Sequence, residues 1–155
     1  MNKNIVTLAI GLLMTGVGLF AADSSVGTWK WNAAKSKTNS TNPVKSRTDV
    51  FEATADGGIK VTRTEQRADG TSYNGSYTFK YDGKEYPVKG LQYDTVSAKR
   101  VDANTITTVV KKTGGKLSQT TKTVFASDGK SKTATTTGTD TEGKSVTATM
   151  VYDKQ

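Results

Sequence analysis

Two arginines, Arg63 and Arg100, are the residues of this sequence best suited to binding a small anion. Each alternates with apolar residues in a segment rich in strand-forming side chains, so both can face the inside of a β-structure. A guanidinium group binds a carboxylate through two parallel hydrogen bonds. The alternative is that each arginine points outward or pairs with an acid such as Glu65.

Cysteine and histidine are both absent from the 155 residues. The lack of cysteine excludes disulfides, thiolate nucleophiles and thiolate metal sites. The lack of histidine excludes a Ser-His-Asp relay, imidazole metal sites and histidine acid–base catalysis. We therefore predict that the protein is not an enzyme and uses no metal and no cofactor.

Turn signals recur along the chain at nearly constant intervals. Asp-Gly pairs begin at residues 56, 69 and 82, 13 residues apart, and three later turns follow at intervals of 14 residues. Such pairs supply the positive φ of tight hairpin turns, and the segments between them are rich in Val, Thr, Tyr and Phe. We predict strands at 26–32, 46–54, 59–67, 72–82, 95–101, 104–112, 117–127, 131–139 and 145–153, with a short one at 85–88.

The predicted fold class is all-β, an up-and-down antiparallel β-barrel of about 8–10 strands. Closure is predicted because it removes the two unpaired edges of a long meander. An open twisted meander and a two-sheet sandwich are the alternatives. No segment shows a convincing helical period, although residues 33–37 are compatible with about one turn of helix.

Strand alternation assigns an inward apolar and aromatic set. Its larger members are Trp29, Trp31, Tyr77, Phe79, Ile106, Phe125, Met150 and Tyr152. These side chains are numerous enough to build the core of one domain. They come from strands at both ends and in the middle of the chain, as a barrel requires.

Several inward faces are unusually polar. Segment 59–67 places Arg63 and Glu65 beside apolar residues, and on 131–139 we assign to the interior the threonines of the face opposite Lys132. A dry core would leave such groups unpaired at about 1–3 kcal/mol each. Either the lumen is wet and lined by threonine, or these strands lie at a rim and are wet on both faces.

The N-terminus carries the one long apolar run, residues 4–20, with Lys3 before it and two alanines after it. This arrangement is typical of a secretory signal peptide. The run is shorter than the roughly 20 residues of a membrane-spanning helix, so cleavage is predicted over retention as an anchor. We divide the chain into a signal peptide, 1–21, and one domain, 22–155. The mature domain is expected to be exported, periplasmic or secreted, without stable membrane insertion.

The formal net charge is +8, and loss of the signal peptide removes only Lys3. A basic balance is compatible with an anionic partner. The lysines, Lys132 among them, are instead spread about one per predicted hairpin, a pattern typical of a solvated outer face. Aromatic residues next to lysines fall on opposite strand faces, so no nucleic-acid partner is predicted.

The two ends of the mature chain resemble a known group of ligand-binding barrels. Residues 27–30, Gly-Thr-Trp-Lys, resemble the start of lipocalins and fatty-acid-binding proteins, the calycin superfamily. Residues 150–154 resemble the closing strand of the fatty-acid-binding branch. Residues 81–88 and 99–105 are similar to small exported bacterial lipocalin-like proteins.

The resemblance implies a lipocalin-like barrel with a lumen for a small ligand. In the fatty-acid-binding branch an Arg-x-Tyr motif holds the ligand carboxylate, whereas here Met150 takes the place of that arginine and only Tyr152 matches. The Thr-Asp-Tyr motif of lipocalins is absent. An anion inside the barrel would therefore depend on Arg63 or Arg100.

The predicted function is that of an extracytoplasmic binding protein for a small hydrophobic or amphipathic ligand in the barrel lumen. The residues expected to contact this ligand are Trp29, Arg63, Tyr77, Phe79, Arg100, Phe125, Met150 and Tyr152. The alternative is a structural or envelope-interaction protein that has no lumen ligand and acts through a basic outer face.

Overall fold

The computed structural model describes residues 23–155, so the predicted signal peptide, 1–21, lies outside the described residues. Within this range there is no helix, and so none that could cross a membrane. The strands are β1 (Gly27–Thr38), β2 (Val44–Ala53), β3 (Ile59–Arg67), β4 (Ser72–Phe79), β5 (Asp82–Lys89), β6 (Thr95–Asp102), β7 (Thr105–Lys111), β8 (Ser118–Phe125), β9 (Ser131–Thr139) and β10 (Ser145–Lys154).

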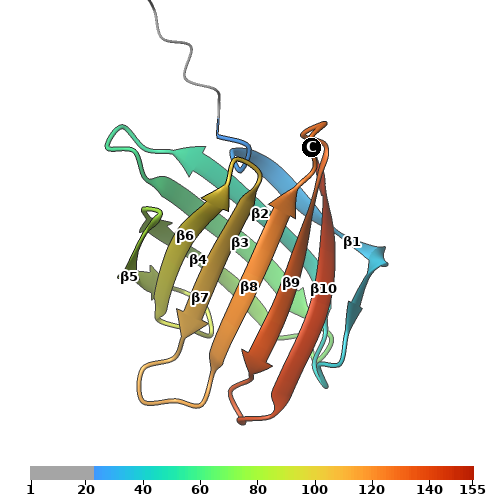
Figure 1. The fold of residues 1–155 in the computed structure, drawn as a ribbon. Helices are drawn as coiled ribbons and strands as arrows, with labels where there is room; N and C mark the ends of the chain where they lie inside the picture. The colour runs from blue at the N-terminus through green and yellow to red at the C-terminus, as the bar shows by residue number, and fades with distance from the viewer. Residues whose placement is uncertain (1–22) are drawn as a thin grey trace, which may run out of the picture.

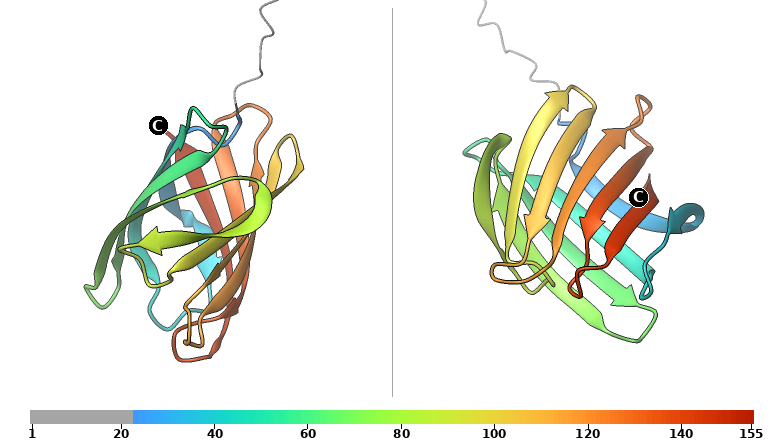
Figure 2. Two further views of the ribbon diagram at one scale, coloured as in Figure 1. Left: turned by 90° about the vertical axis from the view of Figure 1, so that its left-hand side faces the viewer. Right: turned by 60° about the horizontal axis from the view of Figure 1, so that its bottom comes forward.

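The ten strands form a closed antiparallel barrel in which each strand pairs with the next along the chain. The first and last strands complete the ring, with Trp31 opposite Tyr152 in the register. Strands β6–β10 form one wall and β2–β4 the facing wall (Figure 1), and the strands of the two walls cross in the tilted view of Figure 2. Closure of an up-and-down barrel is thus confirmed over the open meander and the sandwich.

The strand bounds follow the turn signals closely, with two differences. Residues 82–89 form a full strand, β5, where only 85–88 were expected. Residues 33–37 are not helical, because β1 continues through them with a register shift between Asn32 and Lys37. Within this irregularity the Ser36 hydroxyl donates to the Asn32 carbonyl at 2.6 Å, which satisfies a backbone group that the interrupted ladder leaves free.

The shortest hydrogen-bonded ladder of the ring lies between β4 and β5, where Gly75 and Gly90 allow the two backbones to come close together. The ladder there joins only Ser76 to Lys89 and Tyr77 to Val88. A Cβ on Gly75 would lie 2.3 Å from the Lys89 carbonyl oxygen. The close approach of the two backbones therefore requires a residue without a side chain at this position.

The end of the barrel that holds both termini of the described chain is closed by aromatic packing. Trp29 is fully buried, its indole N–H donates to the Ser25 carbonyl at 2.8 Å, and its ring lies 5.5 Å from that of Phe125. Phe79 is also buried here and packs edge-on against Tyr81. Both termini lie at this end, the upper one in Figure 1.

We expect Trp29→Ala to lower the free energy of unfolding by about 3–5 kcal/mol, because it removes a large, fully buried, hydrogen-bonded side chain. Urea denaturation monitored by circular dichroism measures the change. Val101→Ala is the control, since Val101 is 61% exposed and its truncation should cost less than about 1 kcal/mol. Equal losses for the two variants would contradict the role given to Trp29.

Candidate functional site

The barrel encloses a cavity of about 150 Å³. Its lining includes Ser40 and Gln92, so it reaches the end of the barrel opposite the termini. An apolar cavity of similar volume holds a benzene molecule, so this space suits a ligand about one ring in size. The lining residues are Thr38, Ser40, Pro43, Val44, Arg47, Asp49, Phe51, Arg63, Arg67, Tyr77, Phe79, Gln92, Tyr93, Ile106, Thr108, Val110, Gln119, Thr121, Thr123, Lys132, Ala134, Thr136, Asp140, Val146, Ala148, Met150 and Tyr152.

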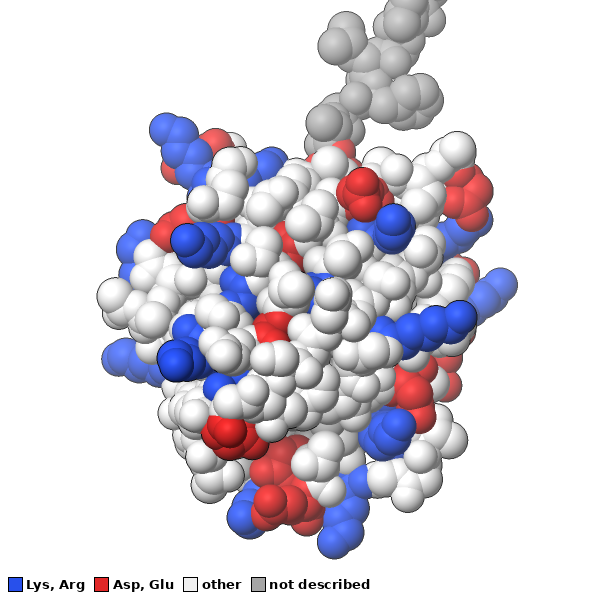
Figure 3. All heavy atoms as spheres, turned by 180° about the vertical axis from the view of Figure 1, so that it is seen from behind, with Lys and Arg blue, Asp and Glu red and all other residues white. Residues whose placement is uncertain are grey.

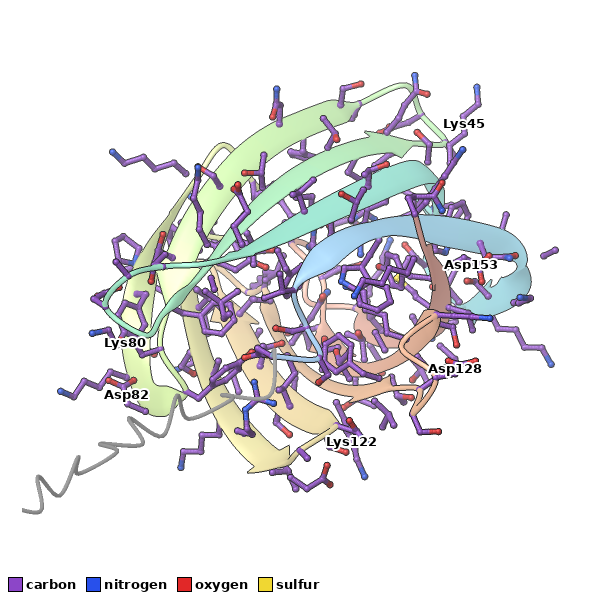
Figure 4. All side chains as sticks on the ribbon, turned by 90° about the horizontal axis from the view of Figure 1, so that it is seen from above. Lys45, Lys80, Asp82, Lys122, Asp128 and Asp153 are labelled. Carbon is purple, nitrogen blue, oxygen red and sulfur yellow. The ribbon has the colours of Figure 1, made fainter. Side chains whose placement is uncertain are left out.

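Charged side chains from three strands project into the interior. They are Arg47 and Asp49 from β2, Arg63, Glu65 and Arg67 from β3, and Lys132 from β9. Alternation with a period of two places all of them on the inward faces. Four of these groups are basic and two are acidic, so positive charge exceeds negative charge among the six. Asp140, in the turn after β9, also lines the cavity. Figure 4, seen along the barrel, shows side chains inside the ring of strands and the six labelled charged residues around its periphery.

Arg63 and Asp49 form a bidentate ion pair between neighbouring strands. The guanidinium Nε lies 2.7 Å from Oδ1 of Asp49, and Nη2 lies 3.0 Å from Oδ2. Arg63 Nη1 also donates to the hydroxyl of Tyr93 at 3.0 Å. Only 2% of the Asp49 side chain and 15% of that of Arg63 are exposed, so this pair is held away from bulk water.

Glu65 lies between two arginines, two positions further along the same pair of strands. Arg47 Nε donates to Oε2 of Glu65 at 2.6 Å, and Arg67 Nε donates to Oε1. Arg47 also donates to the Tyr152 hydroxyl at 2.9 Å. One carboxylate thus serves two guanidinium groups, and Tyr152 of β10 joins the network from across the β1 strand.

The acids of this network remain ionised. Burial alone would raise the pKa of Asp49, but the nearby charges of Arg63 and Lys132 outweigh burial and hold the pKa well below its ordinary value. Burial likewise opposes ionisation of Glu65, and Arg47, Arg63 and Arg67 lower its pKa below the usual value. Both carboxylates are therefore charged near neutral pH. Among residues 23–155, no three acidic side chains gather into a cluster that could hold a metal ion.

Lys132 lies inside the barrel, where the sequence predicts an outer, solvated position. Its side chain is 4% exposed, and Ala134 and Thr136 share its buried face. The predicted inward set of this strand, the threonines of the opposite face, points outward instead. The error arose because an inner face of lysine, alanine and threonine is no more apolar than an outer face of threonine, so alternation alone did not distinguish them.

Aromatic rings surround the Lys132 ammonium. Nζ lies 4.2 Å from the ring centre of Phe51, 4.6 Å from that of Tyr152 and 5.2 Å from that of Trp29. Its nearest carboxylate oxygen, Oδ2 of Asp49, is 3.7 Å away. The pKa of Lys132 is lowered to about 7, because burial, together with the charges of Arg63 and Arg47, outweighs the opposing effect of Asp49.

Apart from Lys132, the wall formed by β7, β8 and β9 carries no charged side chain on its inner face and is rich in threonine. Thr108, Thr121, Thr123 and Thr136 line the cavity there, and the hydroxyls of Thr121 and Thr136 lie 2.8 Å apart. Because the ring is closed, these strands have no free edge, and one face of each borders the lumen. For Thr121 and Thr123 of β8 the structure supports the polar lumen over the rim, whereas the threonines predicted to line the lumen from 131–139 face outward.

The structure divides the residues predicted to contact a ligand into two groups. Arg63, Tyr77, Phe79, Met150 and Tyr152 line the cavity. The others lie at the closed end of the barrel and are Trp29, Arg100 and Phe125.

Arg100 forms an ion pair with Asp23 at the closed end, and its guanidinium carbon lies 4.2 Å above the ring of Tyr81. The hydroxyl oxygens of Tyr81 and Ser25 lie 3.1 Å apart, within hydrogen-bond distance. Arg100 is therefore part of the cap that covers this end of the barrel. The two arginines singled out from the sequence occupy different environments, and Arg63 alone of the two faces the lumen.

Arg47, Asp49 and Lys132 belong to the site but were not expected there. The sequence does hold a signal for Arg47 and Asp49. Both share one face of a predicted strand with the apolar Phe51, which indicates that this face points inward. For Lys132 the sequence holds no comparable signal. Its place depends on the pairing of β9 with β8 and β10.

Comparison with models of known protein families and with curated protein sequences finds no match to this chain. Several solved structures resemble it in fold. The fluorescent protein UnaG is similar with a TM-score of 0.56 and 15% sequence identity, over 85% of this chain and 98% of that one. The S-type phycobiliprotein lyase CPES from Guillardia theta is similar with a TM-score of 0.56 and 11% identity, over 85% and 89%. EF1p2_mFAP2b bound to DFHBI is similar with a TM-score of 0.51 and 11% identity, over 87% and 97%.

These similarities extend over most of each chain, but the sequence identity is low, so they establish a shared fold only. Together with the closed ten-stranded barrel they identify a calycin-type, lipocalin-like fold. The fold implied by the resemblance at the two ends of the sequence is thus confirmed.

We expect Asp49→Asn to destabilise the protein by about 3–5 kcal/mol, because it leaves Arg63 and Lys132 buried without this carboxylate. Urea denaturation at neutral pH measures the loss. Glu52→Gln is the matched control on the same strand, since the side chain of Glu52 is 55% exposed and its pair with Lys60 is worth less than about 1 kcal/mol. A loss for Asp49→Asn as small as that of the control would contradict the proposed network.

Stability should rise as the pH increases from about 7 toward 10, because Lys132 loses its proton in the folded protein near pH 7 but in the unfolded chain only near 10.4. Between these values the unfolded chain binds more protons, so the free energy of unfolding increases with pH. Urea midpoints at about pH 6.5 and about pH 9 test the sign. In Lys132→Met the increase in the free energy of unfolding with pH should be largely lost. If the increase is as large as in the unmodified protein, it arises from groups other than Lys132.

Proposed function

We propose that this protein binds a small, partly apolar molecule with one anionic group inside its barrel. The observation that carries the proposal is the excess of positive charge in the lumen, where three arginines share two carboxylates even when Lys132 is neutral. Arg47 and Arg67 share the single carboxylate of Glu65, and Arg63 shares Asp49 with Lys132. Buried charge that lacks a full counter-charge is costly, so an entering anion would gain the interaction energy that the protein leaves unused.

The arginines keep hydrogen-bonding capacity for such a ligand. A guanidinium group carries five N–H donors. Arg63 uses three of them, two on Asp49 and one on Tyr93, within the part of the chain that the structure describes. Charge-assisted hydrogen bonds from the remaining donors suit a carboxylate or a similar planar anion.

The rest of the cavity suits an apolar or weakly polar body. Phe51, Phe79, Ile106 and Val110 supply apolar contacts on both walls, and the threonine hydroxyls of β7–β9 accept or donate single hydrogen bonds. Most ligand pockets combine an apolar lining with a few placed polar groups. The similar structure of EF1p2_mFAP2b bound to DFHBI supports the use of a barrel of this kind for a small organic molecule.

We place this binding activity outside the cytoplasm, on the strength of the signal-peptide pattern in residues 1–21. We propose a carrier or sequestering role without catalysis. No charged patch of one sign dominates the face in Figure 3, where basic and acidic side chains are interspersed. This face therefore gives no support to the alternative of a function through a basic outer surface.

Benzoate and benzamide form a matched pair of one-ring probes for this proposal. We expect benzoate to bind more tightly than the neutral amide by roughly 10- to 100-fold, the worth of one charge-assisted hydrogen bond. Isothermal titration calorimetry with the mature protein measures both affinities. Arg47→Gln, which leaves Glu65 paired with Arg67, should weaken benzoate binding by about tenfold.

Lys122→Gln provides the control, because Lys122 is exposed on the outer face of β8 and its loss changes the net charge by the same amount. Its affinity for benzoate should equal that of the unmodified protein. Equal binding of benzoate and benzamide would refute the anionic specificity. Absence of uptake for both probes would refute lumen binding and leave the structural role as the better explanation.

A further inference from the structure

Lys132 places a primary amine on the wall of the cavity rather than on the protein surface. Its side chain is 4% exposed, it lines the cavity, and three aromatic rings lie within 5.2 Å of Nζ. The arginines of the network have short contacts to carboxylates. The Nζ of Lys132 has one carboxylate contact, to Oδ2 of Asp49 at 3.7 Å. That distance exceeds an ordinary N–H···O hydrogen bond.

The charged and titratable groups around Lys132 weaken its ammonium form. Arg47 and Asp49 face it from β2, Arg63 from β3 and Tyr152 from β10. Two cations and burial oppose the charge, and one carboxylate supports it. A desolvated lysine beside other cations is the environment in which the neutral, nucleophilic amine becomes available near neutral pH. The pKa of about 7 agrees with this geometry.

We propose that Lys132 captures an aldehyde ligand in the lumen as a reversible imine. The inference rests on the proposed function, because the aldehyde must enter the same cavity. It adds a covalent contact to a site that otherwise binds through charge and apolar surface. The ligand class that follows is a small aromatic or short-chain aldehyde, matched to a cavity of about 150 Å³.

The reaction is a condensation that needs no oxidant or reductant. The Nζ lone pair of Lys132 attacks the carbonyl carbon, the carbonyl π electrons move to oxygen, and one proton passes from nitrogen to oxygen to give a carbinolamine. Loss of hydroxide from carbon and of the second proton from nitrogen then forms the C=N bond and one water molecule. Amine and aldehyde thus become imine and water, and hydrolysis reverses the reaction.

The surroundings of Nζ suit both protonation states of the product. A neutral imine forms from the neutral amine and adds no charge to an interior that already has a surplus of positive groups. A protonated imine keeps the contacts of the ammonium group, with Asp49 as counter-charge and the faces of Phe51 and Tyr152 as cation–π partners. The ligand body then extends from Nζ into the cavity that Lys132 lines.

Reductive trapping with benzaldehyde and cyanoborohydride tests the inference on the mature protein near pH 7. The hydride converts the imine to a stable secondary amine, which intact mass detects and peptide mapping locates. We expect Lys132 to be labelled first, at least about tenfold faster than exposed Lys122. An ordinary lysine, with a pKa near 10.4, has only about one neutral amine in 2,500 at pH 7. Labelling spread evenly over exposed lysines, or absent from Lys132, would overturn the proposal.

Two variants and a competitor complete the test. Lys132→Met should lose the fast adduct, whereas Lys122→Met should keep it. Benzoate should slow the labelling of Lys132 in the unmodified protein, because both probes occupy one cavity. If benzoate binds but Lys132 forms no adduct, imine formation is refuted and the proposed function stands. If neither benzoate nor benzaldehyde binds, both the proposed function and imine formation are refuted. Peptide mapping of the unmodified protein shows whether Lys132 is labelled even if Lys132→Met fails to fold.

Discussion

The pairing of β1 with β10 is the constraint on which the interior of this protein depends. The other strands pair with their chain neighbours through hairpins, which local turn chemistry can form. Only the contact between the first and last strands converts that ribbon into a ring. Closure satisfies both sheet edges and creates an inside, so that side chains from β2, β3 and β9 meet across a lumen instead of facing solvent on an open sheet. The cavity and its charges are consequences of this one long-range pairing.

Within that ring, the central polar contact is the one between Asp49 and Arg63. It neutralises a carboxylate that burial would otherwise force to take up a proton, and it fixes a guanidinium group beside the cavity. Buried pairs of this kind contribute little net stability compared with apolar replacements, so this contact does not by itself account for the stability of the barrel. The surplus of cations around two carboxylates is the basis of the anion preference that we propose, and it also weakens the charged form of Lys132. One electrostatic arrangement thus underlies both the non-covalent and the covalent binding that we propose.

Much of the fold could be predicted because it is encoded locally. Asp-Gly turns, β-branched segments and strict alternation located the strands, and the inward assignment of Arg63 and Glu65 with Ile59 and Val61 was confirmed. Residues 33–37 were misjudged because small and polar residues carry no clear period, and a bulged strand stabilised by pairing with β10 overrode the local pattern. Arg100 followed the same alternation as Arg63, yet it caps the closed end with Asp23, a partner 77 residues away.

The sequence by itself determined the all-β class, the hairpin order and the absence of thiol and imidazole chemistry, because these depend on residue types and on neighbours along the chain. Tertiary structure alone decided which polar faces share the lumen and which charges meet there. Lys132 shows the reason most clearly. Its face on β9 follows from register with β8 and β10, and its low pKa follows from burial among Phe51, Asp49 and Arg63, which lie about 70 to 80 positions away along the chain. Desolvation and charge proximity act through space, and no local pattern in the sequence contains those distances.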